Sequence, residues 1–294
     1  MMKIKTVNEW LKEKYGTKVY RLSLTSGCTC PNRDGKISYG GCTFCSEGGS
    51  GDFAASDIDE AKKKVNGKFP KSIPENQRKY IAYFQSYSNT YGDPDRLYEL
   101  YSSVLSRPEI VILSLGTRPD CIDDSVVGML KKLSVIKPVW VELGLQTVHE
   151  ETARRINRGY TLEVFEKAYR VLRNAGITVI VHVILGLPGE SEDMMLDTVR
   201  YLSQLNPVLE GIKIQLLHVL KNTALEKEFR IKPFKIFTME EYCHLVIKCL
   251  KIIPSETVIH RMTGDGSKKL LVEPQWSGDK KKVINYLNNL IAKS

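Results

Sequence analysis

The strongest constraint on the fold is a regular alternation of apolar, β-branched runs with amphipathic segments between about residues 20 and 220. Several runs are apolar almost throughout, as expected for parallel strands that are buried on both faces. The segments between them have helical spacing, which predicts strand–helix–strand units and a parallel sheet. The expected strands are Val19–Leu24, Tyr80–Gln85, Ile110–Leu115, Val139–Leu143, Thr178–Leu185 and Gly211–Leu217. The expected helices are Asp95–Ser106, Asp123–Leu133, Leu162–Ala175 and Ser191–Leu205.

Six strand–helix units are too few for a closed eight-stranded barrel. The α/β pattern therefore leaves two architectures open, a doubly wound sheet and an open partial barrel. After residue 220 the pattern changes to a helix, a short extended run and a final helix. We predict an N-terminal segment at 1–18, a barrel at 19–220 and a C-terminal extension packed on it at 221–294.

Polar and glycine residues follow each of the six expected strands. In parallel α/β proteins the reactive groups lie just beyond the carboxyl ends of the strands, which share one edge of the sheet. These loops therefore predict a single site, and they lie at 26–30, 85–90, 116–120, 142–147, 186–190 and 218.

The bulk properties of the 294 residues fit an ordinary globular protein with a net charge of +9. No apolar run reaches the 18 residues that suggest a membrane span, and the N-terminus has no apolar core of a secretory signal. We therefore expect a cytoplasmic protein without membrane contact. The excess of lysine and arginine raises the odds of a polyanionic partner such as RNA, without establishing one.

Four of the seven cysteines fall within eighteen residues, at Cys28, Cys30, Cys42 and Cys45. In a reducing compartment such clustering indicates metal binding rather than disulfides. The cysteines alone fit either a structural zinc site with four thiolates or a [4Fe–4S] cluster held by three, with one iron open to a ligand. Their position directly after the first strand favours the cluster, because a structural zinc gains nothing from the active-site edge.

The motif Cys42-Thr43-Phe44-Cys45 resembles the second half of the radical S-adenosylmethionine (SAM) signature. The gap of eleven residues before it is similar to that of the Elongator catalytic subunit, a tRNA-modifying protein. The likeness continues at 116–120, 142–147, 157–160, 186–190 and 260–266, so it covers most of the chain. The chain resembles a bacterial group of elongator-like radical SAM proteins, the YhcC/YtqA-like family.

This resemblance implies a partial (β/α)6 TIM-type barrel with a [4Fe–4S] cluster on Cys30, Cys42 and Cys45, and with Cys28 as a bystander. In the superfamily, reductive cleavage of SAM yields a 5′-deoxyadenosyl radical that takes a hydrogen atom from the substrate. The cofactor supplies this chemistry, while the protein supplies orientation and excludes water.

The predicted SAM-binding residues are Phe44 for the adenine, Gln85 and Asn89 in place of the usual Gly-Gly-Glu segment, Glu142 and Gln146 for ribose and amine, Arg158 for the carboxylate, and Gly186 for close approach to the adenine. Three of these residues have a plainer interpretation. Phe44 could be a core side chain, Arg158 a surface arginine, and Gly186 part of an ordinary turn.

For the substrate, Lys213 and His218 are the predicted catalytic residues, because both belong to the sixth strand or its end. Arg118, His260 and Arg261 are predicted to contact substrate or RNA. The resemblance implies tRNA as substrate, with a change at the 5-substituent of the wobble uridine, and a reducing partner such as flavodoxin or ferredoxin. Two alternatives stay open: a radical SAM enzyme for a small molecule or a protein, and a non-catalytic zinc or Fe–S protein that binds RNA.

Overall fold

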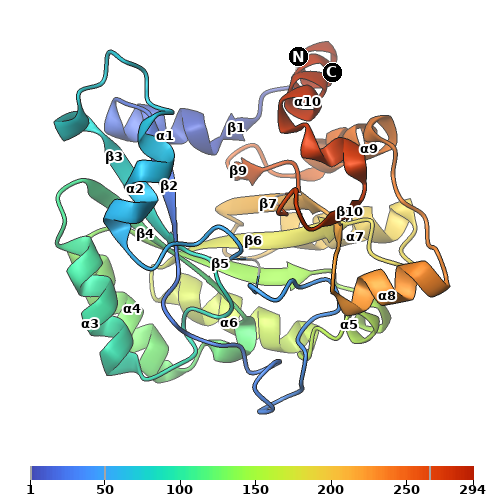
Figure 1. Ribbon diagram of the computed structural model, residues 1–294, viewed down its shortest axis with the longest axis horizontal. Helices are drawn as coiled ribbons and strands as arrows, with labels where there is room; N and C mark the ends of the chain where they lie inside the picture. The colour runs from blue at the N-terminus through green and yellow to red at the C-terminus, as the bar shows by residue number, and fades with distance from the viewer. Residues whose placement is uncertain (1, 50, 265) are drawn as a thin grey trace.

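An eight-stranded parallel sheet forms the centre of the computed structural model, which describes residues 2–49, 51–264 and 266–294 (Figure 1). Its strand order is β1-β9-β7-β6-β5-β4-β3-β2, and every neighbouring pair is parallel. The strands are β1 (Lys5–Thr6), β2 (Val19–Leu24), β3 (Lys79–Phe84), β4 (Ile110–Thr117), β5 (Val139–Gln146), β6 (Thr178–Leu185), β7 (Gly211–Leu216) and β9 (Val258–Arg261). A separate antiparallel pair joins β8 (Val219–Leu220) to β10 (Leu271–Glu273).

Most of the helices connect consecutive strands, and several pack on the outer face of the sheet. They are α1 (Val7–Tyr15), α2 (Ile58–Asn66), α3 (Pro94–Leu105), α4 (Asp124–Ile136), α5 (Glu150–Arg155), α6 (Leu162–Asn174), α7 (Glu192–Ser203), α8 (Ala224–Ile231), α9 (Met239–Ile252) and α10 (Lys280–Lys293). Side-chain caps fix several starts, as at Ser191, whose hydroxyl accepts the Met194 amide before α7. No helix of the described ranges is long and apolar enough to cross a membrane.

The order of the strands decides between the two expected architectures. From β2 to β7 each strand lies next to its predecessor in sequence, so every crossover moves in the same direction. A doubly wound sheet requires a reversal of that order, and none occurs among these strands. The chain is therefore an α/β protein with an open partial barrel of the TIM type, as the resemblance implied.

The two ends of the chain complete one edge of the sheet. Strand β9 pairs with β7 through Val258 and Gly211, and the short β1 pairs with β9 through Lys5 and Val258. The sequence predicted an extended run near β9, but it missed β1 and the helix α1 that follows. The sheet thus takes strands from all three predicted segments, whose boundaries stay a prediction.

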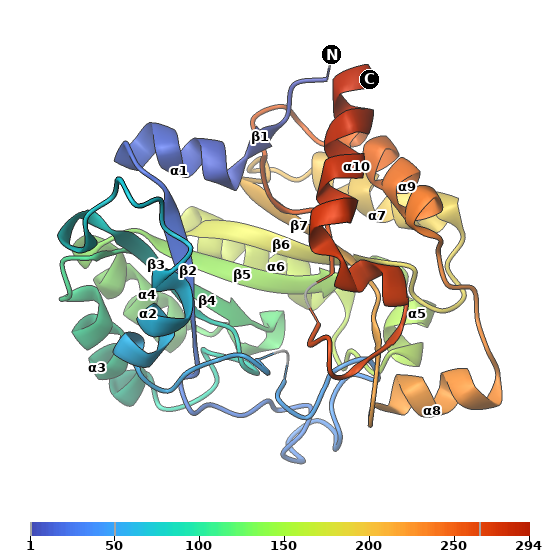
Figure 2. The same ribbon diagram turned by 45° about the horizontal axis from the view of Figure 1, so that its top comes forward.

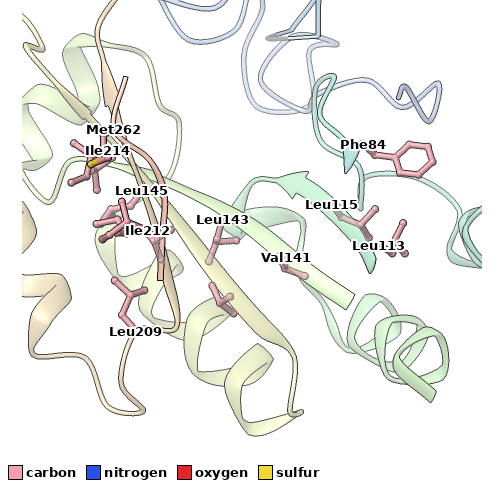
Figure 3. Close-up of a cluster of buried hydrophobic side chains, with 14 of the residues drawn as sticks. Phe84, Leu113, Leu115, Val141, Leu143, Leu145, Leu209, Ile212, Ile214 and Met262 are labelled. Carbon is pink, nitrogen blue, oxygen red and sulfur yellow. The ribbon is translucent and has the colours of Figure 1, made fainter. Parts of the chain in front are cut away.

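Alternate residues of the strands separate the outer core from the barrel interior. Outward side chains of the central strands form an apolar layer beneath the helices (Figure 3), among them Leu113, Val141, Leu143 and Ile212. Inward side chains at the amino ends of the strands form a second apolar cluster, to which α1 adds Val7 and Leu11. The helix α1 therefore closes the bottom of the barrel.

A polar layer lies directly above this apolar floor, two residues further along each strand. Val19 is followed by Arg21, Ile81 by Tyr83, Ile112 by Ser114, Trp140 by Glu142, Ile180 by His182, Gly211 by Lys213 and Val258 by His260. Because side chains on a strand repeat every two residues, these polar groups point into the same interior. They form the base of the candidate site.

Candidate active site

A cavity of about 230 Å³ opens above the polar layer at the carboxyl ends of the strands. Its walls come from loops that are far apart in sequence, including Cys30, Gln85, Gly116, Gln146 and Leu216. The structure thus gathers the strand-end loops around one space, at the edge where parallel α/β proteins carry their reactive groups.

Three of the clustered cysteines, Cys30, Cys42 and Cys45, line this cavity. None of the three forms a disulfide with another described cysteine. Burial raises the pKa of Cys42 to about 12, and the neighbouring thiols Cys45 and Cys30 add to the rise. Cys28 does not line the cavity, and its Sγ accepts from Nη2 of Arg96 at 3.5 Å.

A set of three soft thiols without the fourth suits an iron–sulfur cluster with one open position. Within residues 2–49, 51–264 and 266–294, no three His, Cys, Asp or Glu side chains converge closely enough to hold a single metal ion. The donor type and the shared cavity therefore fit the cluster that the sequence implied.

Two asparagines fix the loop that carries the cysteines. Asn32 donates from Nδ2 to the Asn157 carbonyl at 2.6 Å, and Asn157 donates from its own Nδ2 to the Gly41 carbonyl at 2.8 Å. Gly159 lies beside this exchange with φ of +81°, and a Cβ there would lie 2.8 Å from Asn32 Oδ1. A glycine is therefore required at 159.

Arg158 is fully buried, and its donors are already used. Nη1 donates to the carbonyls of Leu145 and Thr147 at 3.0 and 2.6 Å. Nε and Nη2 donate to the Tyr160 carbonyl, and Nη2 also faces a carboxylate oxygen of Glu150 at 3.4 Å. This geometry argues against the predicted contact with the SAM carboxylate. We propose instead that Arg158 holds the end of β5 and the start of α5 together.

Arg118 lines the cavity beside Arg158 and is also mostly buried. Its guanidinium pairs with Asp120 at 2.7 Å, donates to the Arg158 carbonyl at 2.9 Å, and lies over the Tyr160 ring at 4.8 Å. Three contacts orient the group without using every donor, so Arg118 can still meet a ligand in the cavity.

Gln85 and Asn89 differ in placement, although the sequence treated them alike. Gln85 lines the cavity, whereas Asn89 is fully buried outside its walls. The Asn89 amide donates to the carbonyls of Phe84 and Gly116 and accepts from Ser26. This arrangement argues against a SAM contact by Asn89. Ser88 does line the cavity, and its buried hydroxyl has no partner.

Glu142 is the centre of the polar layer and reaches the cavity wall. Its carboxylate pairs with the Lys213 ammonium and accepts from His182 Nε2 at 2.8 Å and Ser114 Oγ at 2.9 Å. Burial alone would raise the pKa of Glu142, but the charge of Lys213 and the hydrogen bond from His182 hold it well below its usual range. Glu142 is therefore an anion that is already satisfied.

Lys213 lies below the cavity rather than in its wall. Besides Glu142, its Nζ contacts the Tyr83 hydroxyl at 3.3 Å. A group this enclosed does not touch a substrate, which argues against the predicted catalytic contact. We propose that Lys213 positions Glu142 and Tyr83. His182 is satisfied on both nitrogens by Glu142 and Gln215, as expected for a core histidine, and it also lines the cavity.

Gln146 lines the cavity at an irregular point of β5. Its φ is +68°, a left-handed conformation that is costly for a residue other than glycine. The buried Oε1 has no hydrogen-bond partner. A strained backbone and an unsatisfied acceptor suit a residue that binds a donor group of a ligand.

The predicted site residues nearest the C-terminus lie in two places, the cavity wall and the barrel interior. His218 and Arg261 line the cavity. His260 instead lies in the barrel interior, where its Nδ1 is 2.9 Å from Arg21 Nη2 and its ring meets Trp140 edge-on. Burial lowers the pKa of His260 well below its usual range, and the charge of Arg21 adds to this. This placement argues against the predicted contact of His260 with substrate or RNA.

Phe44 lines the cavity beside the cysteines, and Gly186 does not. Gly186 has φ of +92°, and a Cβ there would approach the Phe237 ring to 3.3 Å. The positive φ fits the ordinary turn that the sequence left open, and the Phe237 ring leaves little room for a side chain there.

Sequence reasoning missed Tyr83, Ser88 and Asn32. Tyr83 was detectable in principle, because it continues the alternation of an apolar and then a polar residue on every inner strand face. No sequence pattern pointed to Ser88 or Asn32, whose roles depend on contacts with distant loops. Cys121, a scattered cysteine in sequence, lies close enough to Cys30 for that thiol to contribute to its raised pKa.

A profile of the Radical SAM superfamily matches residues 27–202, and a profile of the Radical SAM C-terminal domain matches residues 209–293. The chain belongs to the radical SAM superfamily. Members of this superfamily are enzymes that use a [4Fe–4S] cluster and SAM, so these are the cofactors of this chain.

Relatives place the chain in the elongator-like part of the superfamily. It is 42% identical over 290 residues to the uncharacterized protein YtqA of Bacillus subtilis, covering 96% of this chain and 88% of that protein. It is 25% identical over 213 residues to Elongator complex protein 3 of Schizosaccharomyces pombe, covering 71% of this chain but 38% of that protein. Among solved structures, Elp3 of Methanocaldococcus infernus matches with a TM-score of 0.66 and 18% identity, covering 92% of this chain and 63% of that one. This last likeness concerns the fold.

Proposed function

We propose that this protein modifies tRNA, with Cys30, Cys42 and Cys45 holding the cluster that cleaves SAM. The observation that carries the proposal is the position of three cysteine thiols in the wall of the strand-end cavity, while Cys28 lies outside it. When bound, the cluster supplies the electron for reductive cleavage of SAM.

The residues of the chain orient and enclose the reactants. Unpartnered polar atoms of Ser88 and Gln146 face the same cavity as the cysteines, and buried groups of this kind are normally satisfied in a complete site. We assign both to SAM, together with Gln85 and Phe44. The buried pair of Glu142 and Lys213 keeps the cavity floor charged and rigid, and burial of the floor excludes water.

The choice of tRNA rests on two supports. The elongator-like sequence relation extends over 71% of the chain, and the net charge of +9 favours a polyanion. We propose the 5-substituent of the wobble uridine as the modified group. The match covers 38% of the Elongator protein. The electron is supplied by a reductant such as flavodoxin or ferredoxin.

The first test measures 5′-deoxyadenosine after anaerobic reconstitution, with dithionite as reductant and SAM as the cosubstrate. The wild type and Cys28→Ala should bind iron and form deoxyadenosine. Cys42→Ala should lose both. The pair is matched, because each variant removes one sulfur from the same loop region while only one removes a proposed ligand.

Bulk tRNA added to the same reaction tests the substrate. Stimulation of deoxyadenosine formation by tRNA, and none by a small-molecule or peptide mixture, would support the proposal. Deoxyadenosine that does not respond to tRNA would favour a different substrate class. Bound zinc without iron or deoxyadenosine would overturn the proposed cluster.

A further inference from the structure

The eleven residues between Cys30 and Cys42 fold into an ordered hairpin beside the mouth of the cavity. We call residues 31–41 the cysteine-loop hairpin. The Ile37 amide donates to the Pro31 carbonyl at 2.8 Å, and a bridge joins Asp34 to Tyr39. Asn157 holds its base, as described above. The residues between Cys30 and Cys42 are therefore an ordered hairpin, and its tip is exposed to solvent.

The tip carries exposed apolar side chains. Tyr39 is 80% exposed and Ile37 is 45% exposed. The Tyr39 ring lies against Gly35, where a Cβ would approach the ring atoms to 2.6 Å. The hydroxyl end of the ring thus lies against the hairpin at Gly35. Such a fixed aromatic platform suits stacking by a flat partner.

Cations and a second exposed aromatic surround the same mouth. Arg33 lies over the Tyr87 ring at 5.5 Å and lines the cavity, and Lys36 lies over the Tyr91 ring at 5.3 Å. Phe53, which is 51% exposed, lines the cavity from another loop. Aromatic rings interleaved with basic side chains are typical of surfaces that bind single-stranded nucleic acid.

A basic segment continues this rim on the other side of the cysteine loop. Residues 221–235, which include α8, carry five lysine or arginine residues and two glutamates. The Leu225 amide donates to the Thr43 carbonyl at 2.8 Å, which ties the start of α8 to the cysteine loop. Figure 2 shows the blue loop region and the orange helix α8 at the same side of the sheet.

We infer that the cysteine-loop hairpin and the α8 segment form a rim that binds an unpaired stretch of RNA. Tyr39 stacks on one unpaired base, lysines of the α8 segment contact the phosphate backbone, and the adjoining nucleotide enters the cavity. This inference rests on the proposed function and adds how the RNA is held. RNA fits better than a protein partner, because the exposed apolar area is small and lies among cations.

The test measures binding of an unmodified tRNA transcript to the reconstituted full chain at several salt concentrations. Tyr39→Ala should weaken binding about 5- to 150-fold, the range for loss of one base–aromatic stack. Tyr39→Phe keeps the ring and should bind nearly as the wild type does. The salt dependence of the Tyr39→Ala variant should stay unchanged.

The cationic part of the rim has its own matched pair. The double variant Lys227→Gln/Lys232→Gln should lower the log–log salt slope by roughly 1 to 2, since each lost phosphate contact removes about 0.7 for a single strand. Lys131→Gln/Lys132→Gln changes the same net charge on α4, away from the cavity mouth, and should leave the slope unchanged.

The outcomes separate this inference from the proposed function. Absence of tRNA binding by the wild type would overturn the RNA substrate itself. If the wild type binds tRNA in a salt-sensitive way and all rim variants bind it equally well, the proposed RNA-binding rim is wrong. The proposal that tRNA is the substrate would be unaffected by that result. If Tyr39→Ala keeps its tRNA affinity but loses activity with flavodoxin and not with dithionite, the hairpin docks a protein reductant, and the inference is wrong.

Discussion

Replacement of Lys213 by methionine tests whether the buried ion pair holds the floor of the site. Methionine keeps most of the volume of the lysine stem, so the change removes charge with little loss of packing. The ammonium of Lys213 lies against Glu142 in the barrel interior, and both side chains are fully buried. In Lys213→Met the carboxylate keeps its hydrogen bonds from Ser114 and His182 and a longer ion pair with Arg21 at 4.0 Å, but it loses its nearest counter-charge.

Loss of one partner of a buried pair costs about 3–5 kcal/mol when the other charge is left unpaired, and the remaining contact with Arg21 places Lys213→Met toward the lower end of this range. The value is of the same order as the whole free energy of unfolding of a typical domain, about 5–15 kcal/mol. Lys213→Met should therefore unfold at a distinctly lower urea concentration than the wild type at pH 7. An exposed lysine changed in the same way, Lys131→Met, should shift the midpoint little.

The stability deficit of Lys213→Met should depend on pH. The pKa of Glu142 lies below its unfolded value of about 4.3, so its ionised form contributes stability above that pH, and the contribution is lost as the pH falls through the folded pKa. Without Lys213, burial favours the protonated carboxyl. The deficit of Lys213→Met relative to wild type should therefore be full at pH 7 and shrink as the pH approaches 4.

Urea unfolding followed by circular dichroism at pH 7, 5.5 and 4.5 measures this deficit. The double variant Lys213→Met/Glu142→Gln removes the uncompensated charge, and it should be more stable at pH 7 than the sum of the two single effects. A deficit below about 1 kcal/mol, or one that does not change with pH, would refute the idea that a charged pair holds the floor.

Three further predictions concern other parts of the site. Arg158→Lys should lower the free energy of unfolding by about 3 kcal/mol, measured in urea, since a single ammonium cannot replace the planar fork of five donors. Gly159→Ala should reduce iron incorporation per chain and lower stability by about 1–3 kcal/mol, because φ is +81° and the new Cβ meets Asn32; an unchanged iron content would contradict the assigned role of this turn. Burial lowers the pKa of both His182 and His218 to about 4, so the unfolded chain binds more protons than the native one between pH 6.5 and 4. The free energy of unfolding should therefore decrease as the pH is lowered from 6.5 to 4, and His218→Asn should make this decrease smaller.

Local periodicity determined which segments form the strands, whereas the strand order was needed to decide that they form a partial barrel. The six strands from β2 to β7 were predicted within a few residues, because an apolar run bounded by turn signals is a property of neighbouring residues. The motif Cys42-Thr43-Phe44-Cys45 likewise carried the resemblance that implied the cofactor, and a motif of neighbouring residues needs no fold to be recognised. The short β1 was missed, because two residues carry no period and only pairing with β9 makes them a strand.

Individual roles within the site depended on tertiary contacts. The sequence could not distinguish Gln85, which reaches the cavity, from Asn89, which ties strand ends together. It also placed Arg158 in contact with the cofactor, whereas the donors of this side chain are used by backbone carbonyls up to 13 residues away. Such assignments follow from which hydrogen-bond partners the fold supplies.

The sequence by itself determined that inward positions on successive strands are apolar first and polar two residues later. Tertiary structure decided what the polar layer does, because the curl of the sheet brings Glu142, Lys213 and His182 from three strands to one point. Strand periodicity is set by the geometry of two consecutive residues, whereas the meeting of these charges is set by strand order and register over 71 residues of sequence. The sequence therefore supplies the polar residues at inward positions, and the fold determines which of them pair in the cavity floor.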